Sequence, residues 1–398
     1  MAYQTTTTTS YGKRLSGSFK GIGGGLLLFL IGTGVLWWNE GRAVKTSKAI
    51  NEAQGVTMQV DNVSTVDPSL NGQLIHASAF AGTNDSLYDA SFGVGATAIK
   101  LHRAVEYYQW VEDARKETRD KLGGGQETVT TYTYKEEWCD SPVNSGDFSD
   151  PDYKGRNFTR LNLEDKSWTA QHVSFGAYVL PEFIINAISG EIPADVNLTG
   201  EQLEQWQKQL LQPDDTLNLQ RVHTQGNVAY FGASPNAPAI GDLRVTFTKV
   251  LPADISIIAK VHGNTFERYI AKNGQTFSGV SMGNVSAESM FQAKHSSNKM
   301  LAWVLRVIGF LFVFIGLKGL FGFLETLFKV VPFLADIVGA GVGLVCMVIG
   351  IVWSLIIIAL AWLAYRPLIG IALLVVVAAG IFFLKKKAKE RKAAATIE

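Results

Sequence analysis

Residues 337–364, IVGAGVGLVCMVIGIVWSLIIIALAWLA, contain no charged side chain and decide the class of this protein. A helix needs about 20 apolar residues to cross a hydrocarbon layer about 30 Å thick, so this run is long enough to span a membrane. A shorter apolar run, 368–384, follows after Tyr365-Arg366-Pro367, where a charge and a proline favour a tight turn. The two runs therefore predict two transmembrane helices.

Two more apolar runs lie upstream. Residues 300–324 carry only Arg306 and Lys318 as charges, both near an end of the run, where a long cationic side chain can reach the headgroups. Residues 21–38 end in Trp37-Trp38, which suits a membrane interface. A signal peptide is the alternative for 21–38, but this run is longer than a typical signal core and lacks a small-residue cleavage site. The sequence thus predicts an integral membrane protein, an α-helical four-span bundle with one N-terminal and three C-terminal spans.

The distribution of charge orients the predicted bundle. Basic residues dominate the tails 1–20 and 385–398, and lysine and arginine in short flanks mark the cytoplasmic side. Four spans place both tails on that side and residues 39–299 on the other side, as a large extracytoplasmic domain. A cluster of basic residues at the other membrane face argues against this orientation, but it flanks a very long loop, where charge has less influence. The cluster consists of Arg42, Lys45, Lys48, Lys294 and Lys299.

The domain 39–299 is predicted to be mainly β with a few helices, an α+β fold, while the threonine-rich residues 1–10 are predicted to be disordered. β-branched and aromatic residues favour strands over 99–112 (IKLHRAVEYYQWVE) and 128–138 (TVTTYTYKEEW), joined by a long mobile loop. Another strand is expected at 73–80. Three later strands, separated by Pro252 and Gly263-Asn264, are expected to form a meander over 242–250, 254–261 and 265–271.

Three helices are predicted in the same domain. One runs over 181–189 with Pro181 at its first position, and one begins at Ser286 and continues into the second span. The third, over 199–211, begins with Thr199 and Gln202 at capping-box spacing. Its apolar residues form one stripe, which favours docking on a sheet over resting on the membrane surface. The stripe consists of Leu203, Trp206, Leu210 and Leu211.

The sequence contains no recognisable catalytic constellation. The six histidines form neither HExxH nor HxH, and there is no P-loop and no strand-borne GxSxG. We therefore predict no enzyme activity and no catalytic, cofactor or metal residues. A net charge of +1 gives no overall field for nucleic acid. The two cysteines, Cys139 and Cys346, lie in the domain and in a span, so a free thiol at Cys139 is favoured over a bridge between subunits.

Small and charged residues at membrane depth are the candidate functional positions. Gly17, Gly21 and Gly25 recur every fourth residue and share one helix face, and Gly339 and Gly343 repeat the pattern. Such faces allow close helix packing, either within one bundle or between subunits, and both alternatives stay open. Three charged residues could line an ion path, although snorkelling and a loop position also explain them. These residues are Arg306, Lys318 and Asp336.

Several blocks of this sequence resemble the transmembrane protein 43 family, also called LUMA. They occur in the family's order and reach from the first span to the last turn. The blocks are NEGRAVKT at 39–46, IKLHRAVEYYQWVE at 99–112, EEW at 136–138, GDLRVTF at 241–247, SAE at 286–288 and WLAYRPL at 362–368. The resemblance implies four spans with a large hydrophilic domain between the first and second, and a membrane protein that is not an enzyme and that self-associates.

For an animal protein, the resemblance implies a location in the endoplasmic reticulum and inner nuclear membrane, with lamins and emerin as partners. Similar proteins also occur in bacteria. This sequence departs from the animal pattern in its N-terminal tail and over most of 139–239. We therefore expect a bacterial cytoplasmic membrane with a periplasmic domain, and the animal compartments and partners only in a eukaryotic source. The expected partners are membrane lipids, further copies of the chain and other membrane proteins, without nucleic acid. The predicted function is a self-associating scaffold that organises membrane assemblies through its extracytoplasmic domain, and the alternative is an ion channel or channel-regulating subunit.

Overall fold

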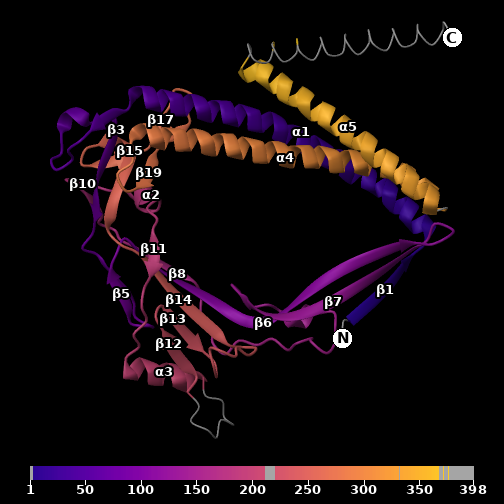
Figure 1. Cartoon of the computed structure of the whole chain (residues 1–398), viewed down its shortest axis with the longest axis horizontal. Coiled ribbons are helices and arrows are strands. Elements are labelled where there is room, and N and C mark those ends of the chain that lie inside the picture. The colour runs from indigo at the N-terminus through magenta and orange to yellow at the C-terminus, as the bar shows by residue number, and fades with distance from the viewer. Residues whose placement is uncertain (1–2, 211–219, 331, 367–370, 372–374, 376–398) are drawn as a thin grey trace, which may run out of the picture. The chain divides into compact units, whose positions relative to one another are not determined.

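The computed structural model describes residues 3–210, 220–330, 332–366, 371 and 375 (Figure 1). Contacts divide the chain into two units. Unit 1 comprises Met1–Thr5, Glu52–Glu117 and Val129–Phe291, and it contains most of the β-sheet residues. Unit 2 comprises Thr6–Asn51, Thr118–Thr128 and Gln292–Glu398, and it contains most of the long helices.

Three helices dominate unit 2: α1 (Tyr11–Val56), α4 (Ala287–Phe328) and α5 (Pro332–Tyr365). Each is long and apolar enough to cross a membrane. They contain the predicted spans 21–38, 300–324 and 337–364, and they extend beyond these limits. The predicted fourth span, 368–384, and the tail 385–398 lie outside the described residues apart from Ile371 and Val375. The chain is thus a membrane protein with a β-rich α+β domain between its first and second apolar helices.

Glycines allow the backbones of α1 and α4 to touch. A Cβ placed on Gly25 would lie 2.7 Å from the carbonyl oxygen of Gly316, and one on Gly32 would lie 2.8 Å from that of Gly309. The positions ascend in α1 as they descend in α4, so the two helices are antiparallel. On each helix the two glycines are seven residues apart and therefore share one face. This spacing creates the narrow contact that close packing in a membrane requires.

We expect Gly32→Val to destabilise unit 2, because its side chain would collide with the backbone of α4. Overpacking of this kind typically costs about 1–3 kcal/mol, so the melting temperature in detergent should fall by several degrees. Gly34→Val is the matched control, since a Cβ at Gly34 meets nothing within 4 Å. Equal melting temperatures for the two variants would show that the α1–α4 contact is not as close as described.

Unit 1 is built on two sheets. The first has eight strands in the order β1-β7-β6-β14-β13-β12, with β11 beside β14 and β8 beside β6. These strands are β1 (Tyr3–Thr9), β6 (Lys100–Asp120), β7 (Gln126–Cys139), β8 (Lys166–Thr169), β11 (Glu191–Pro193), β12 (Val222–Gln225), β13 (Val228–Phe231) and β14 (Leu243–Val250). Along β6, buried and half-buried residues alternate from Lys100 to Trp110, so one face of this part of the strand lies on the core.

The second sheet has seven strands in the order β10-β9-β3-β15-β16, with β19 beside β15 and β2 beside β3. They are β2 (Met58–Val60), β3 (Leu74–Gly82), β9 (Ser174–Phe175), β10 (Tyr178–Val179), β15 (Ala253–His262), β16 (Thr265–Glu267) and β19 (Gly279–Met282). The remaining short elements are β4 (Ser86–Asp89), β5 (Val94–Thr97), β17 (Tyr269–Ile270), β18 (Thr276–Phe277) and the 3-10 turns Pro68–Leu70 and Ser145–Asp147.

Each sheet has its own apolar core. The core of the first sheet gathers Phe92, Phe231 and Phe247 with Trp206 of α3 (Gly200–Leu210). The core of the second sheet gathers Ile75, Phe175 and Ile257 with residues of α2 (Glu182–Ile185). Each helix thus covers apolar side chains of one sheet.

The predicted capping box of α3 is confirmed. The backbone N–H of Gln202 donates to Thr199 Oγ1 at 3.2 Å, and the N–H of Thr199 donates to Gln202 Oε1 at 3.0 Å. The apolar stripe docks on the first sheet, with Trp206 only 9% exposed, while Leu211 lies outside the described residues. The helix predicted at 181–189 is shorter than expected, because α2 ends at Ile185 and Pro181 is its N-cap instead of its first residue.

The expected meander is wrong, because β14 and β15 belong to different sheets. β14 pairs with β6 and β13, whereas β15 pairs with β3, β16 and β19. Leu251-Pro252 connects them, and proline cannot donate to a ladder, so the chain changes sheets here. Only the hairpin of β15 and β16 remains from the prediction.

The prediction of a long mobile loop between the two aromatic strands is also wrong. β6 continues to Asp120 and β7 begins at Gln126, so only a tight turn remains, with Gly123 and Gly124 at φ values of 87° and 83°. Residues 113–119 are exposed, which lets charged side chains occupy both faces of the strand. The N-terminal tail also differs from its predicted disorder, since the threonine-rich Tyr3–Thr9 forms β1 beside β7. Threonine is β-branched and suits this conformation.

Candidate functional site

A buried carboxylate joins the three long helices of unit 2. Glu40 of α1 is only 1% exposed. Arg306 of α4 donates to it twice, from Nε to Oε1 at 2.6 Å and from Nη2 to Oε2 at 2.9 Å. Trp362 of α5 donates its indole N–H to Oε2 at 2.5 Å. One carboxylate is therefore satisfied by donors from two other helices.

Further polar contacts surround this carboxylate. Arg306 also lies over the rings of Trp303 and Trp362, 4.9 and 5.7 Å from their centroids. Asn39 donates to the carbonyl of Ala302 at 2.9 Å. One turn further along α1, Arg42 Nη1 donates to the side chain of Asn298 at 3.0 Å. We call Glu40, Arg306 and Trp362 the Glu40 cluster.

The Glu40 cluster changes the interpretation of the predicted charged residues. Arg306 was expected to reach the headgroups or line an ion path, but its guanidinium is instead paired with Glu40. Lys318 and Asp336 are exposed. Within the described part of the chain, no hydrogen bond or ion pair joins Arg306, Lys318 and Asp336. The ion-path hypothesis therefore rests on Lys318 and Asp336 alone.

The predicted glycine positions behave differently from one another. Gly25 packs against the α4 backbone, and a Cβ on Gly339 would meet the side chain of Glu325 at 2.9 Å. At Gly17, Gly21 and Gly343 an added Cβ meets nothing within 4 Å. Sequence reasoning missed Gly32, Gly309, Gly316 and Gly319, which are also in the α1–α4 contact. The signal was a spacing of seven, which the search for every-fourth-residue glycines did not detect.

We expect Glu40→Gln to destabilise the protein strongly, since it leaves Arg306 without its counter-charge. Removing one partner of a buried ion pair typically costs about 3–5 kcal/mol. The double variant Glu40→Gln/Arg306→Met removes both charges and should recover part of the loss. Thermal unfolding of both variants in the same detergent measures this. If Glu40→Gln alone is as stable as the wild type, the ion pair of Glu40 and Arg306 does not stabilise the protein.

The turn between β6 and β7 packs against the other end of the helices. Asp120 pairs with Arg14 of α1 at 2.8 Å and with Lys329 at 3.2 Å, just beyond α4. The N–H of Gly123 donates to the carbonyl of Val330 at 3.1 Å. Within unit 2, residues 39–51 and 118–128 thus lie at opposite ends of the first span. The prediction that residues 39–299 form one domain on one side of the membrane stays a prediction, which these contacts make it possible to test.

Cysteine labelling tests this placement. In a Cys139→Ser background, Ser10→Cys and the exposed Leu122→Cys should react with an impermeant maleimide from the same side of sealed vesicles. Lys48→Cys, at the other end of the helices, is the control and should react from the opposite side. If Leu122→Cys instead reacts from the same side as Lys48→Cys, and Ser10→Cys reacts from the opposite side, residues 118–128 belong to the domain predicted from the sequence.

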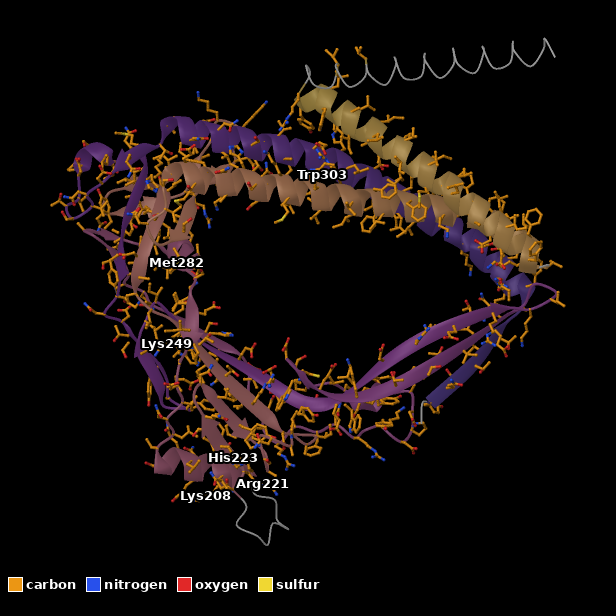
Figure 2. All side chains as sticks on the ribbon, viewed as in Figure 1. Lys208, Arg221, His223, Lys249, Met282 and Trp303 are labelled. Atoms are coloured by element: carbon orange, nitrogen blue, oxygen red, sulfur yellow. The ribbon has the colours of Figure 1, made fainter. Side chains whose placement is uncertain are left out.

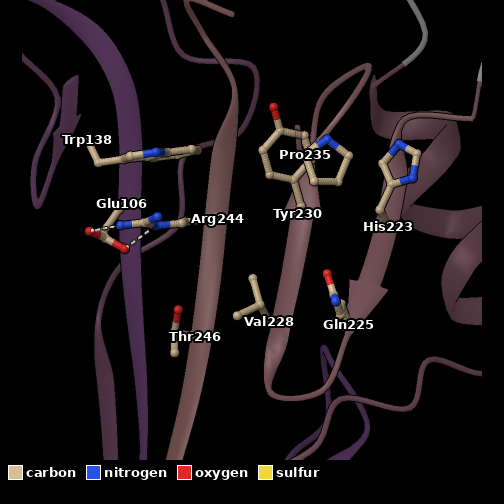
Figure 3. Close-up of a pocket in the computed structure, with 9 residues that line it drawn as sticks. All are labelled: Glu106, Trp138, His223, Gln225, Val228, Tyr230, Pro235, Arg244 and Thr246. Carbon is tan, nitrogen blue, oxygen red and sulfur yellow. Dashed lines mark hydrogen bonds and ion pairs between the residues drawn. The ribbon is translucent and has the colours of Figure 1, made fainter. Parts of the chain in front are cut away.

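The exposed face of the first sheet carries a pocket of about 520 Å³ (Figure 3). Arg244 forms a two-fold ion pair with Glu106, its Nη2 lying 2.8 Å from Oε1, and its guanidinium lies 4.4 Å from the ring of Trp138. Tyr230 donates to Asp242 at 2.5 Å. Burial, followed by this hydrogen bond, raises the pKa of the Tyr230 phenol. The phenol is therefore held as a neutral donor.

One nitrogen in this pocket lacks a partner. His223 Nε2 is buried and has no hydrogen bond among the described residues. Aromatic surfaces, an amide and a neutralised arginine can bind a polar ligand with a flat face. Glu106 is committed to Arg244, and no nucleophile with an adjacent base lines the pocket. Sequence reasoning missed this pocket because its residues come from five strands, β6, β7, β12, β13 and β14, and from the loop at Pro235.

Metal and thiol chemistry find little support. In residues 3–210, 220–330, 332–366, 371 and 375, no group of three or more His, Cys, Asp and Glu side chains could hold a metal ion. Cys139 and Cys346 are both free thiols. Burial, and then the nearby Glu137 carboxylate, raise the pKa of the Cys139 thiol. A raised pKa lowers the thiolate fraction, so Cys139 is poorly reactive.

Apolar spans joined by a polar cluster, with a β-rich domain inserted after the first of them, define a multi-pass membrane protein. The chain belongs to the transmembrane protein 43 family, whose model matches residues 107–367. It is 30% identical to human transmembrane protein 43 over 92% of this chain and 89% of the relative. It is 31% identical to the rat protein (89% and 87%) and 28% identical to the homolog in Drosophila melanogaster (88% and 90%). No solved structure matches the chain.

Proposed function

We propose that this protein is a non-enzymatic membrane scaffold that self-associates through α1. The observation that carries the proposal is the open glycine face at Gly17 and Gly21, where an added Cβ meets nothing within 4 Å. Glycine lowers helix stability by about 1 kcal/mol relative to alanine, so glycines whose Cβ position is open suggest another use. In a membrane that use is close approach of a second helix.

The division of glycines along α1 supports this proposal. Gly25 and Gly32 pack against α4, whereas the Cβ positions of Gly17 and Gly21 on the same helix are open, although the carbonyl of Gly21 lies near Gly319 of α4. The most apolar stretch of α1 is only 17% buried within one copy of the chain, so much of its surface is available to lipid or to another subunit. A second copy is the natural partner because close homotypic contacts use the same small residues on both sides.

The β-rich unit 1 supplies the surface through which a scaffold would hold other membrane proteins. Its pocket around Trp138 and Arg244 is exposed and suited to binding, and the described residues that line this pocket form no catalytic arrangement. The basic tails favour a cytoplasmic placement of residues 1–20 and 385–398. The predicted location is a bacterial cytoplasmic membrane with a periplasmic domain, or the endoplasmic reticulum or inner nuclear membrane of a eukaryote. The labelling experiment above decides the orientation. A channel or channel-regulating subunit remains the alternative that Lys318 suggests.

Gly21→Leu should weaken self-association by about tenfold, which corresponds to ~1.4 kcal/mol. Light scattering of the full chain in mild detergent, over a range of protein-to-detergent ratios, measures the oligomer fraction. Gly343→Leu tests the second open position in the same way. Gly34→Leu is the control, because this glycine is also open but lies on another face of α1. Monomers at every ratio for the wild type, or equal weakening by Gly34→Leu, would rule out the proposed face.

A further inference from the structure

A groove of about 520 Å³ lies between α4 and α5. Its walls are almost entirely apolar and include Trp303, Phe310 and Met347 (Figure 2 labels Trp303). One end is formed by Arg306 and Trp362 of the Glu40 cluster. Because α4 and α5 are apolar helices of membrane-spanning length, this groove faces hydrocarbon instead of water. Its volume lies in the range of small-molecule sites.

One polar group in the groove has no partner. Ser354 is 5% exposed, and its hydroxyl forms no hydrogen bond among the described residues. A serine in a transmembrane helix usually donates to the carbonyl four residues earlier, but this one does not. A buried unpaired hydroxyl is unfavourable, and more so in hydrocarbon. The site therefore lacks a polar atom that would pair with Ser354.

The end of the groove at Arg306 is cationic. Nε and Nη2 of Arg306 are committed to Glu40, while Nη1 has no hydrogen bond in the described part of the chain. The same end of unit 2 carries several basic residues and one acid, Glu40, whose charge Arg306 already balances. The other basic residues are Arg42, Lys45, Lys48, Lys294, Lys299 and Arg366. This surplus of positive charge favours an anionic headgroup.

These features occur in the order of the parts of a phospholipid. Ser354 lies eight residues before Trp362 on α5, which at 1.5 Å per residue places it about 12 Å deeper in the membrane. Phe310 and Met347 line the groove beyond it. A charged end, a hydroxyl below it and then an apolar channel match a phosphate, an ester carbonyl and an acyl chain.

We propose that the groove between α4 and α5 binds one anionic glycerophospholipid. Its phosphate accepts from Nη1 of Arg306, an ester carbonyl accepts from the Ser354 hydroxyl, and one acyl chain lies along Phe310 and Met347. The groove belongs to a single copy of the chain, so this inference stands independently of self-association.

Native mass spectrometry of the full chain tests the proposal, with phosphatidylglycerol and phosphatidylcholine as the probes. The wild type should retain one phosphatidylglycerol under conditions that remove phosphatidylcholine. Ser354→Ala should lower retention by about five- to tenfold, as expected for one hydrogen bond. Met347→Trp should fill the groove and abolish retention. Leu344→Trp is the control, since Leu344 is 65% exposed on the same helix and does not line the groove.

Four results would overturn the proposal. Equal retention of both lipids by the wild type would show that the headgroup charge is not recognised. Undiminished retention of phosphatidylglycerol by Ser354→Ala would show that Ser354 does not donate to the lipid ester. Preferential retention of a sterol would assign the groove to another ligand. Dissociation of oligomers by Met347→Trp, without any change in bound lipid, would assign it to a second copy. Should Met347→Trp fail to fold by circular dichroism, the lipid preference of the wild type and Ser354→Ala still decide the question.

Discussion

The burial of one negative charge, on Glu40, constrains the whole of unit 2. Removing a carboxylate from water costs several kcal/mol, which is offset only where its lone pairs are all well satisfied. Here the donors come from different helices, Arg306 from α4 and Trp362 from α5. Sliding either helix along α1 would leave the carboxylate short of a donor. The cluster therefore fixes the axial position of each helix relative to the other two.

The glycine contacts depend on the same alignment. Lipid chains are as apolar as leucine, so apolar burial does not draw helices together inside a membrane, and close packing has to do so. Gly32 lies eight residues before Glu40 on α1, and it meets the α4 backbone near Gly309, just past Arg306. A shift that broke the ion pair would also drive side chains into these glycine contacts. Polar and steric constraints thus select one arrangement of α1 and α4.

The sequence predicted the structural features that depend on residues close together in the chain. Long apolar runs located three described helices, and Thr199 with Gln202 located α3, because both signals are contained in a short stretch of chain. The sequence placed Glu40 at the start of the predicted domain 39–299 and gave no sign of its ion pair, since its partner Arg306 is 266 positions away. Likewise, nothing local distinguishes β14 and β15, which belong to different sheets. The mostly charged residues 113–119 concealed part of a strand because both of its faces are exposed there, so no alternation of apolar residues marks it.

Unfilled surface on the helices links the two proposals while keeping them physically separate. Open glycines at Gly17 and Gly21 lie near the start of α1, whereas the groove at Trp362 lies near the end of α5, next to Glu40. Since Glu40 and Gly21 are nineteen residues apart on one helix, about 28 Å at 1.5 Å per residue, the two features lie near opposite faces of the bilayer. A subunit packed on the glycines would therefore leave the mouth of the groove open to a lipid headgroup. A lipid bound in the groove would contact both α4 and α5 and would bind Arg306. The position of Arg306 is already fixed by its ion pair with Glu40 of α1.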